Sequence, residues 1–146
     1  MNVNQPEENV VVGLYDNYHE TQKEILAIEI RKTRNKLITI AVIIFVFDPI
    51  ALSMTNAISL QTMIWVSVLP LVIIGLALFS IKEPLAAMVI AAMIIAGLWI
   101  YSIAVTGGLA AISGWLGKAI IIYLLFAGFQ NAIEATRIKK ELKSAL

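Results

Sequence analysis

Four long apolar segments constrain this chain more than any other feature. They span residues 37–58, 63–81, 84–105 and 109–129. The hydrocarbon core of a bilayer is about 30 Å thick, and an α-helix crosses it with about 20 predominantly apolar residues. The whole chain is 60% hydrophobic and only 14% charged, which is too apolar for an ordinary soluble domain. The sequence therefore predicts an all-α fold: an integral membrane four-helix bundle with cytoplasmic helical extensions at both ends.

Short polar turns separate the four segments. The first turn consists of Asn56, Ser59, Gln61 and Thr62, and the third of Thr106-Gly107-Gly108. The second is the charged pair Lys82-Glu83, followed by Pro84 at the start of a helix, a position that proline favours. These turns are too short to hold a domain, so residues 37–129 are expected to form one transmembrane domain.

The basic residues predict the orientation of the spans. Ten of the eleven Lys and Arg lie before the first span, between the second and third, or after the fourth. With four spans these three groups share one side, and the positive-inside rule makes that side cytoplasmic. Aromatic residues that favour the interface fall near the opposite side: Trp65, Trp99, Tyr101 and Trp115. We therefore expect a multi-pass protein of the bacterial inner membrane with both termini in the cytoplasm.

Both ends of the chain have a predicted structure. The opening residues lack a basic stretch and a cleavage site, so a cleaved signal peptide is not expected, and residues 1–15 are expected to be disordered or loosely ordered. Residues 16–36 favour an amphipathic cytoplasmic helix with Asp16 as its N-cap. Residues 130–146 favour a cytoplasmic helical tail. No Gly or Pro separates either helix from its neighbouring span, so both are expected to continue directly into the membrane.

These two extensions carry apolar side chains at helical spacing. The candidate contact residues are Tyr18, Ile25, Ile28, Ile133, Ile138 and Leu142. One interpretation is that the extensions lie on anionic lipid headgroups through their Lys and Arg. The other is that they pack on each other or on a partner as a cytoplasmic stalk.

Asp48 lies inside the first apolar segment, next to Pro49. It is about 18 Å along a helix from Lys36, the expected cytoplasmic boundary. A carboxylate at that depth is costly unless it is paired, protonated or in contact with protein or water. Lys118 in the fourth span has about the same depth, which predicts an ion pair between the two. The alternative for Lys118 is that its stem extends toward the interface near Trp115.

Pro49 predicts a kink or a break in the first span. If the helix restarts there, Asp48 becomes its N-cap and Pro49 its first residue. Broken helices of this kind build ion or substrate sites in transporters, whereas a capped kink alone has no such role. The sequence leaves both interpretations open.

Small residues at four-residue spacing predict faces where helix backbones approach closely. In the third span they are Ala87 with Ala91 and Ala92 with Ala96, and in the fourth Gly128 with Ala132. This spacing favours tight bundling and self-association.

The sequence offers no catalytic constellation. It has no cysteine and one histidine, His19, so we expect no enzymatic activity, no metal site and no cofactor such as haem. Nucleic acid is not expected as a partner. The expected partners are the lipid bilayer, further copies of the chain or other membrane subunits. The favoured function is an oligomeric or accessory scaffold component of a membrane assembly, and the alternative is a small ion- or proton-coupled transporter or channel that uses Asp48.

Overall fold

The computed structural model describes residues 5–54, 60–106 and 115–144, with side chains at 17–50, 64, 67–104 and 115–144. Within these residues the chain is helical apart from the turn at 80–83, and it contains no strand. The helices are α1 (Gln5–Met54), α2 (Leu60–Phe79), α3 (Pro84–Thr106) and α5 (Trp115–Ser144). The all-α fold class predicted from the sequence is therefore confirmed.

Two of the described helices are long and apolar enough to cross a membrane. They are Pro84–Ala104 within α3 and Trp115–Ser144, which is the whole of α5. α2 contains a shorter apolar stretch, Ser67–Phe79. Parts of the predicted spans 37–58, 63–81 and 109–129 fall on residues or side chains outside those that the structure describes.

α1 is a single helix of 50 residues. It already begins at Gln5, whereas the sequence predicted loose order over residues 1–15. Pro6 falls in the first turn, where backbone amides have no intrahelical acceptor, so this proline does not stop the helix. The predicted continuity between segment 16–36 and the first span is present.

α1 also continues through Pro49 to Met54. The predicted alternative in which the helix restarts at Pro49 with Asp48 as its N-cap is therefore wrong. Proline removes one backbone donor, but a helix packed against neighbours tolerates this loss, because other groups and small backbone adjustments satisfy the freed carbonyl. Pro70 lies inside α2 in the same way and is buried.

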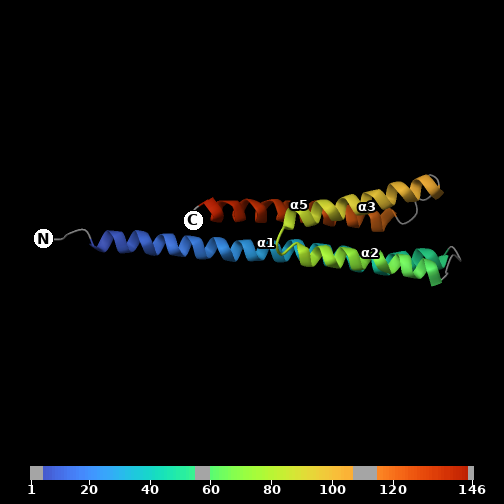
Figure 1. Ribbon diagram of the computed structural model, residues 1–146, viewed down its shortest axis with the longest axis horizontal. Helices are drawn as coiled ribbons and strands as arrows, with labels where there is room; N and C mark the ends of the chain where they lie inside the picture. The colour runs from blue at the N-terminus through green and yellow to red at the C-terminus, as the bar shows by residue number, and fades with distance from the viewer. Residues whose placement is uncertain (1–4, 55–59, 107–114, 145–146) are drawn as a thin grey trace.

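The helices run nearly parallel to one long axis (Figure 1). α1 packs mainly on α5 and on α2, and α3 packs mainly on α5. The turn between α2 and α3 lies partway along α1, and both α1 and α5 extend past it in the same direction (Figure 1). We call this extension, residues 17–36 of α1 and 130–144 of α5, the stalk.

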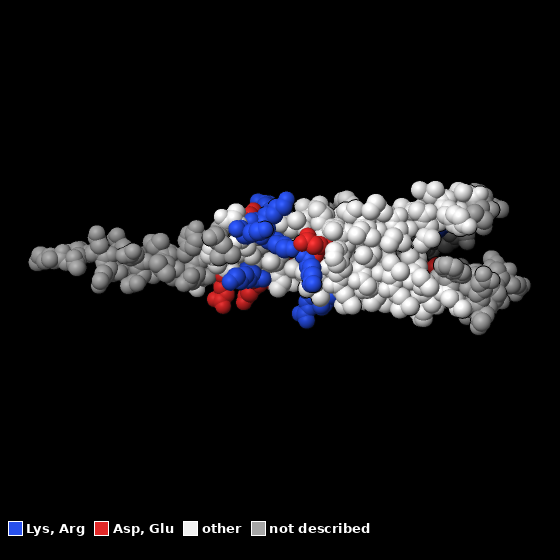
Figure 2. Space-filling view, viewed as in Figure 1, with Lys and Arg blue, Asp and Glu red and all other residues white. Residues whose placement is uncertain are grey.

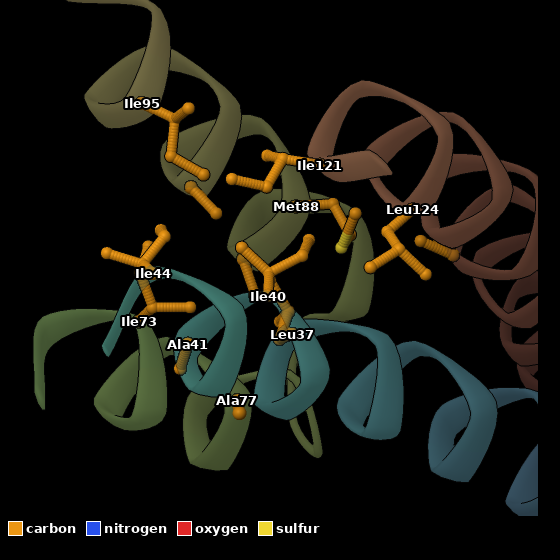
Figure 3. Packing of buried hydrophobic residues seen from close by; sticks show 13 residues of the cluster. Leu37, Ile40, Ala41, Ile44, Ile73, Ala77, Met88, Ile95, Ile121 and Leu124 are labelled. Atoms are coloured by element: carbon orange, nitrogen blue, oxygen red, sulfur yellow. The ribbon is translucent and has the colours of Figure 1, made fainter. Parts of the chain in front are cut away.

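The buried hydrophobic core lies between the four helices and contains residues from each of them. Figure 3 shows Leu37 and Ile40 of α1 directed toward Met88 of α3, with Ile121 and Leu124 of α5 beside them. The core residues of α1 recur at spacings of three and four, which puts them on one helical face. The complete buried cluster is Leu37, Ile40, Ala41, Ile44, Ile73, Ala77, Ala87, Met88, Ala91, Ile95, Ile121, Leu124 and Ala132.

Hydrogen bonds close the turn between α2 and α3 tightly. The buried Ser80 hydroxyl donates to the Ala77 carbonyl at 2.7 Å. The backbone amides of Lys82 and Glu83 donate to the Phe79 carbonyl at 3.0 and 3.2 Å. These bonds satisfy carbonyls at the end of α2 that have no partner within the helix. α3 then starts at Pro84, as the sequence predicted.

Candidate functional site

Two glycines of α5 define its register against α1. A Cβ added at Gly128 would lie 3.6 Å from the Lys36 Cβ, and one added at Gly117 would lie 4.0 Å from the Phe47 ring. Phe47 follows Lys36 along α1, whereas its contact Gly117 precedes Gly128 along α5. The two helices are therefore antiparallel. The two contacts are the same number of residues apart on each helix, so this register holds along the shared length.

Asp48 and Lys118 lie close in height within this register. Asp48 directly follows Phe47, and Lys118 directly follows Gly117. Because the two helices are antiparallel, these two steps point in opposite directions along the axis. Asp48 and Lys118 are therefore offset by about two residues, or roughly 3 Å. Both are partly buried. Ion pairs in the stalk and the turn join Lys32 to Glu29, Arg137 to Glu141 and Lys139 to Glu83. The Asp48–Lys118 pair stays a prediction.

Lys118 lines an open groove of about 310 Å³ between α3 and α5. The other lining residues are Trp99, Ile103, Trp115, Ala119 and Ile122. A lysine stem can lie along such an apolar surface while its ammonium group reaches polar surroundings. This geometry is compatible with the alternative in which Lys118 extends toward the interface.

The three small-residue pairs have different positions in the structure. Ala87 and Ala91 of α3 are fully buried, as is Ala132 of α5, and Gly128 is also buried. Ala92 is partly buried and Ala96 is exposed, because the face of α3 that carries Ala91 and Ile95 is the one turned into the core. The described packing therefore uses the pair Ala87–Ala91 and the pair Gly128–Ala132.

Met88 of α3 occupies the space that Gly128 leaves open. A Cβ at Gly128 would lie 2.5 Å from the Met88 Cε and 3.1 Å from its Sδ, and Met88 has no exposed surface. The Cβ of Lys36 lies on another side of the same glycine at 3.6 Å. Gly128 is therefore the point where α1, α3 and α5 meet, which the sequence did not reveal.

In the stalk, α1 and α5 pack on each other. Thr33 of α1 is fully buried, and Ala135 and Ile138 of α5 are 0% and 4% exposed. The Thr33 hydroxyl donates to the Glu29 carbonyl of its own helix at 3.0 Å, which satisfies this buried polar group. This packing of α1 on α5 agrees with the interpretation in which the extensions form a stalk, and contact with lipid headgroups stays a prediction.

The other candidate contact residues divide by exposure. Tyr18, Ile25 and Ile28 of α1 are exposed by 59%, 38% and 51%. Ile133 of α5 is 55% exposed, and Leu142 is partly buried. α1 thus uses one face for the core and leaves a second apolar face open.

Lys139 connects the stalk to the turn between α2 and α3. Its Nζ donates to the Lys82 carbonyl at 2.6 Å and to the Glu83 Oε1 at 2.8 Å. Sequence reasoning missed this contact. The only sequence features that indicate the contact are an acidic residue in the turn and a basic tail on the same predicted side of the membrane.

The described residues contain no group of three or more His, Cys, Asp or Glu side chains that could hold a metal ion. His19 makes an edge-to-face ring contact with Tyr18, with ring centroids 6.2 Å apart. His19 is partly buried in the stalk.

Comparison with known proteins finds no match: no family model, no curated protein and no solved structure matches this chain.

Proposed function

We propose that this chain is a small multi-pass protein that crosses a bacterial inner membrane four times, with both termini in the cytoplasm. The two membrane-length helices support this proposal. So do large apolar side chains exposed on the outer faces of the bundle, among them Leu71, Leu78, Met93 and Phe126. In water such a surface is unfavourable, whereas in lipid it needs no cover. Lys and Arg gather in one zone next to this apolar surface (Figure 2).

Within that membrane, the proposed role is an oligomeric or accessory scaffold component without catalytic activity. The observation that carries it is the open apolar face of α1, formed by Tyr18, Ile25 and Ile28. Tyr18 lies about 27 Å along the helix beyond Lys36. Because α1 is one continuous helix, a first span that crosses the bilayer would carry this face away from the membrane surface. Apolar side chains at that height favour contact with another protein helix.

The chain contains no cysteine, so single cysteines can map this contact in membranes. The expected result is that cysteines replacing Tyr18, Ile25 or Ile28 form cross-linked adducts of defined mass. Cysteines replacing Lys23 or Ala27, which are exposed elsewhere on α1, serve as matched controls. Equal cross-linking at both sets, or none at either, would reject the scaffold proposal.

The second candidate is a small ion- or proton-coupled transporter or channel. The observation in its favour is Asp48, a partly buried acid in the first proposed span, at nearly the height of Lys118. Ionisable residues at such depth commonly mark ion pathways. Flux into proteoliposomes should be compared for the wild type, Asp48→Asn, Lys118→Met and the double variant. Flux that Asp48→Asn abolishes would establish the transporter, and absence of flux under every ion gradient would leave the scaffold.

A further inference from the structure

An open groove of about 330 Å³ lies where α3 meets the stalk. Leu85 lines it from the first turn of α3, and the rest of its wall is one face of α5. The α5 residues are Ile133, Thr136, Arg137, Lys140 and Glu141. We call this feature the boundary groove, because it begins just past Gln130, where the fourth span is proposed to leave the membrane.

The polarity of the boundary groove changes along its length. Its membrane-proximal part is Leu85 and Ile133, both apolar. Arg137 and Lys140 follow one and two turns further along α5, in the direction of the cytoplasm. A phospholipid at the inner leaflet has the same order, with acyl chains toward the membrane centre and its phosphate outward.

The charges of the boundary groove favour an anionic ligand. Arg137 donates through Nε to the Glu141 carboxylate at 3.0 Å, and the guanidinium has further N–H donors on its two terminal nitrogens. Lys140 has no ion-pair partner among the residues whose side chains the structure describes. Glu83 nearby is already paired with Lys139. A planar guanidinium beside an ammonium group is a favourable partner for a phosphodiester.

Other basic residues lie close to this groove. Lys82 is in the turn directly before α3, and Lys143 is one helical turn beyond Lys140. Figure 2 shows that Lys and Arg gather in one zone along the molecule, with some Asp and Glu among them. The local field therefore adds to the attraction for a negatively charged headgroup.

We infer that the boundary groove binds an anionic phospholipid of the inner leaflet, with its phosphate on Arg137 and Lys140 and an acyl chain along Leu85 and Ile133. This inference rests on the proposed membrane location but not on the scaffold role. The bound lipid would bridge α3 and α5 and fill an apolar surface that neither helix covers.

Binding can be measured by native mass spectrometry of the full chain in an uncharged detergent. The probes are dioleoyl phosphatidylglycerol, which is anionic, and dioleoyl phosphatidylcholine, which is zwitterionic with the same acyl chains. The wild type is expected to retain the phosphatidylglycerol preferentially. A basic residue near an anionic lipid typically changes its affinity about five-fold. Arg137→Gln with Lys140→Gln should therefore weaken phosphatidylglycerol binding roughly thirty-fold.

Three further variants separate the groove from general surface charge and from misfolding. Lys23→Gln with Arg31→Gln removes the same two charges from α1 and should leave phosphatidylglycerol binding unchanged. Glu141→Gln removes the competing carboxylate and should tighten it, a gain that a misfolded protein would not show. Ile133→Trp fills the exposed floor of the groove and should weaken binding of both lipids.

Equal losses in the two double variants would overturn the inference, since binding would then follow overall charge. So would equal retention of the two lipids by the wild type. If the chain is instead soluble without detergent, the proposed membrane location itself fails. The two failures are therefore distinguishable.

Discussion

Gly128→Ala tests the packing of α1, α3 and α5 most directly. The new methyl group would lie 2.5 Å from the Met88 Cε and 3.1 Å from its Sδ, so the Met88 side chain must move. Met88 is fully buried, and its Cε is the end of a flexible side chain, so the side chain has to change rotamer within the core. Such overpacking typically costs about 1–3 kcal/mol.

The backbone contributes with the opposite sign. Alanine is favoured over glycine inside a helix by roughly 0.5–1 kcal/mol. The expected net effect of Gly128→Ala is therefore a destabilisation of about 1 kcal/mol, within a range of roughly 0 to 2.5 kcal/mol.

Gly75→Ala and Gly97→Ala are matched controls, because a Cβ at either position meets no atom within 4 Å. Both control substitutions gain the higher helix preference of alanine without a steric clash. The difference in unfolding free energy between Gly128→Ala and these controls should thus be about 1–3 kcal/mol, which isolates the overpacking cost.

Reversible unfolding in mixed micelles, followed by the helical circular dichroism signal as the fraction of denaturing detergent rises, measures this difference. The same alanine should cost no more than the controls in a Met88→Ala background, where the obstructing side chain is absent. Equal stability of Gly128→Ala, Gly75→Ala and Gly97→Ala in the wild-type background would refute the proposed three-helix contact.

Three further outcomes can be measured in the same assay. Leu37→Ala removes a fully buried core side chain and should cost about 2–5 kcal/mol, toward the lower end in lipid, where the transfer contribution is small. Ile138→Ala should destabilise far more than Ile133→Ala, since their exposures are 4% and 55%; similar losses would contradict the packing of the stalk. A double-mutant cycle of Lys139→Ala and Glu83→Ala should give a coupling of roughly 0.2–1 kcal/mol that falls with added salt, because both side chains are about half exposed.

The features of this fold that sequence predicted are those set by local rules. The continuous helix from residues 16–36 into 37–54, and the one through Gln130 into 131–144, followed from the absence of breaking residues. The near-equal height of Asp48 and Lys118 followed from counting along helices, because the rise per residue is fixed. The predicted restart of the helix at Pro49 was wrong, because it relied on the local preference of proline alone. Packing by neighbouring helices compensates for the backbone N–H donor that proline lacks.

Which face of a helix is buried is a different kind of information. α2 and α3 are apolar on all sides, so hydrophobic periodicity does not distinguish the inner face from the outer one. Ala87–Ala91 and Ala92–Ala96 have the same spacing and composition, yet the first pair is fully buried and Ala96 is exposed. Met88 is buried as well, and its Sδ and Cε lie against Gly128 of α5, where an added Cβ would be 2.5 Å from the Cε. The contact between Met88 and Gly128 therefore favours the observed orientation of α3, and because it joins residues of different helices, the pattern within one helix does not reveal it.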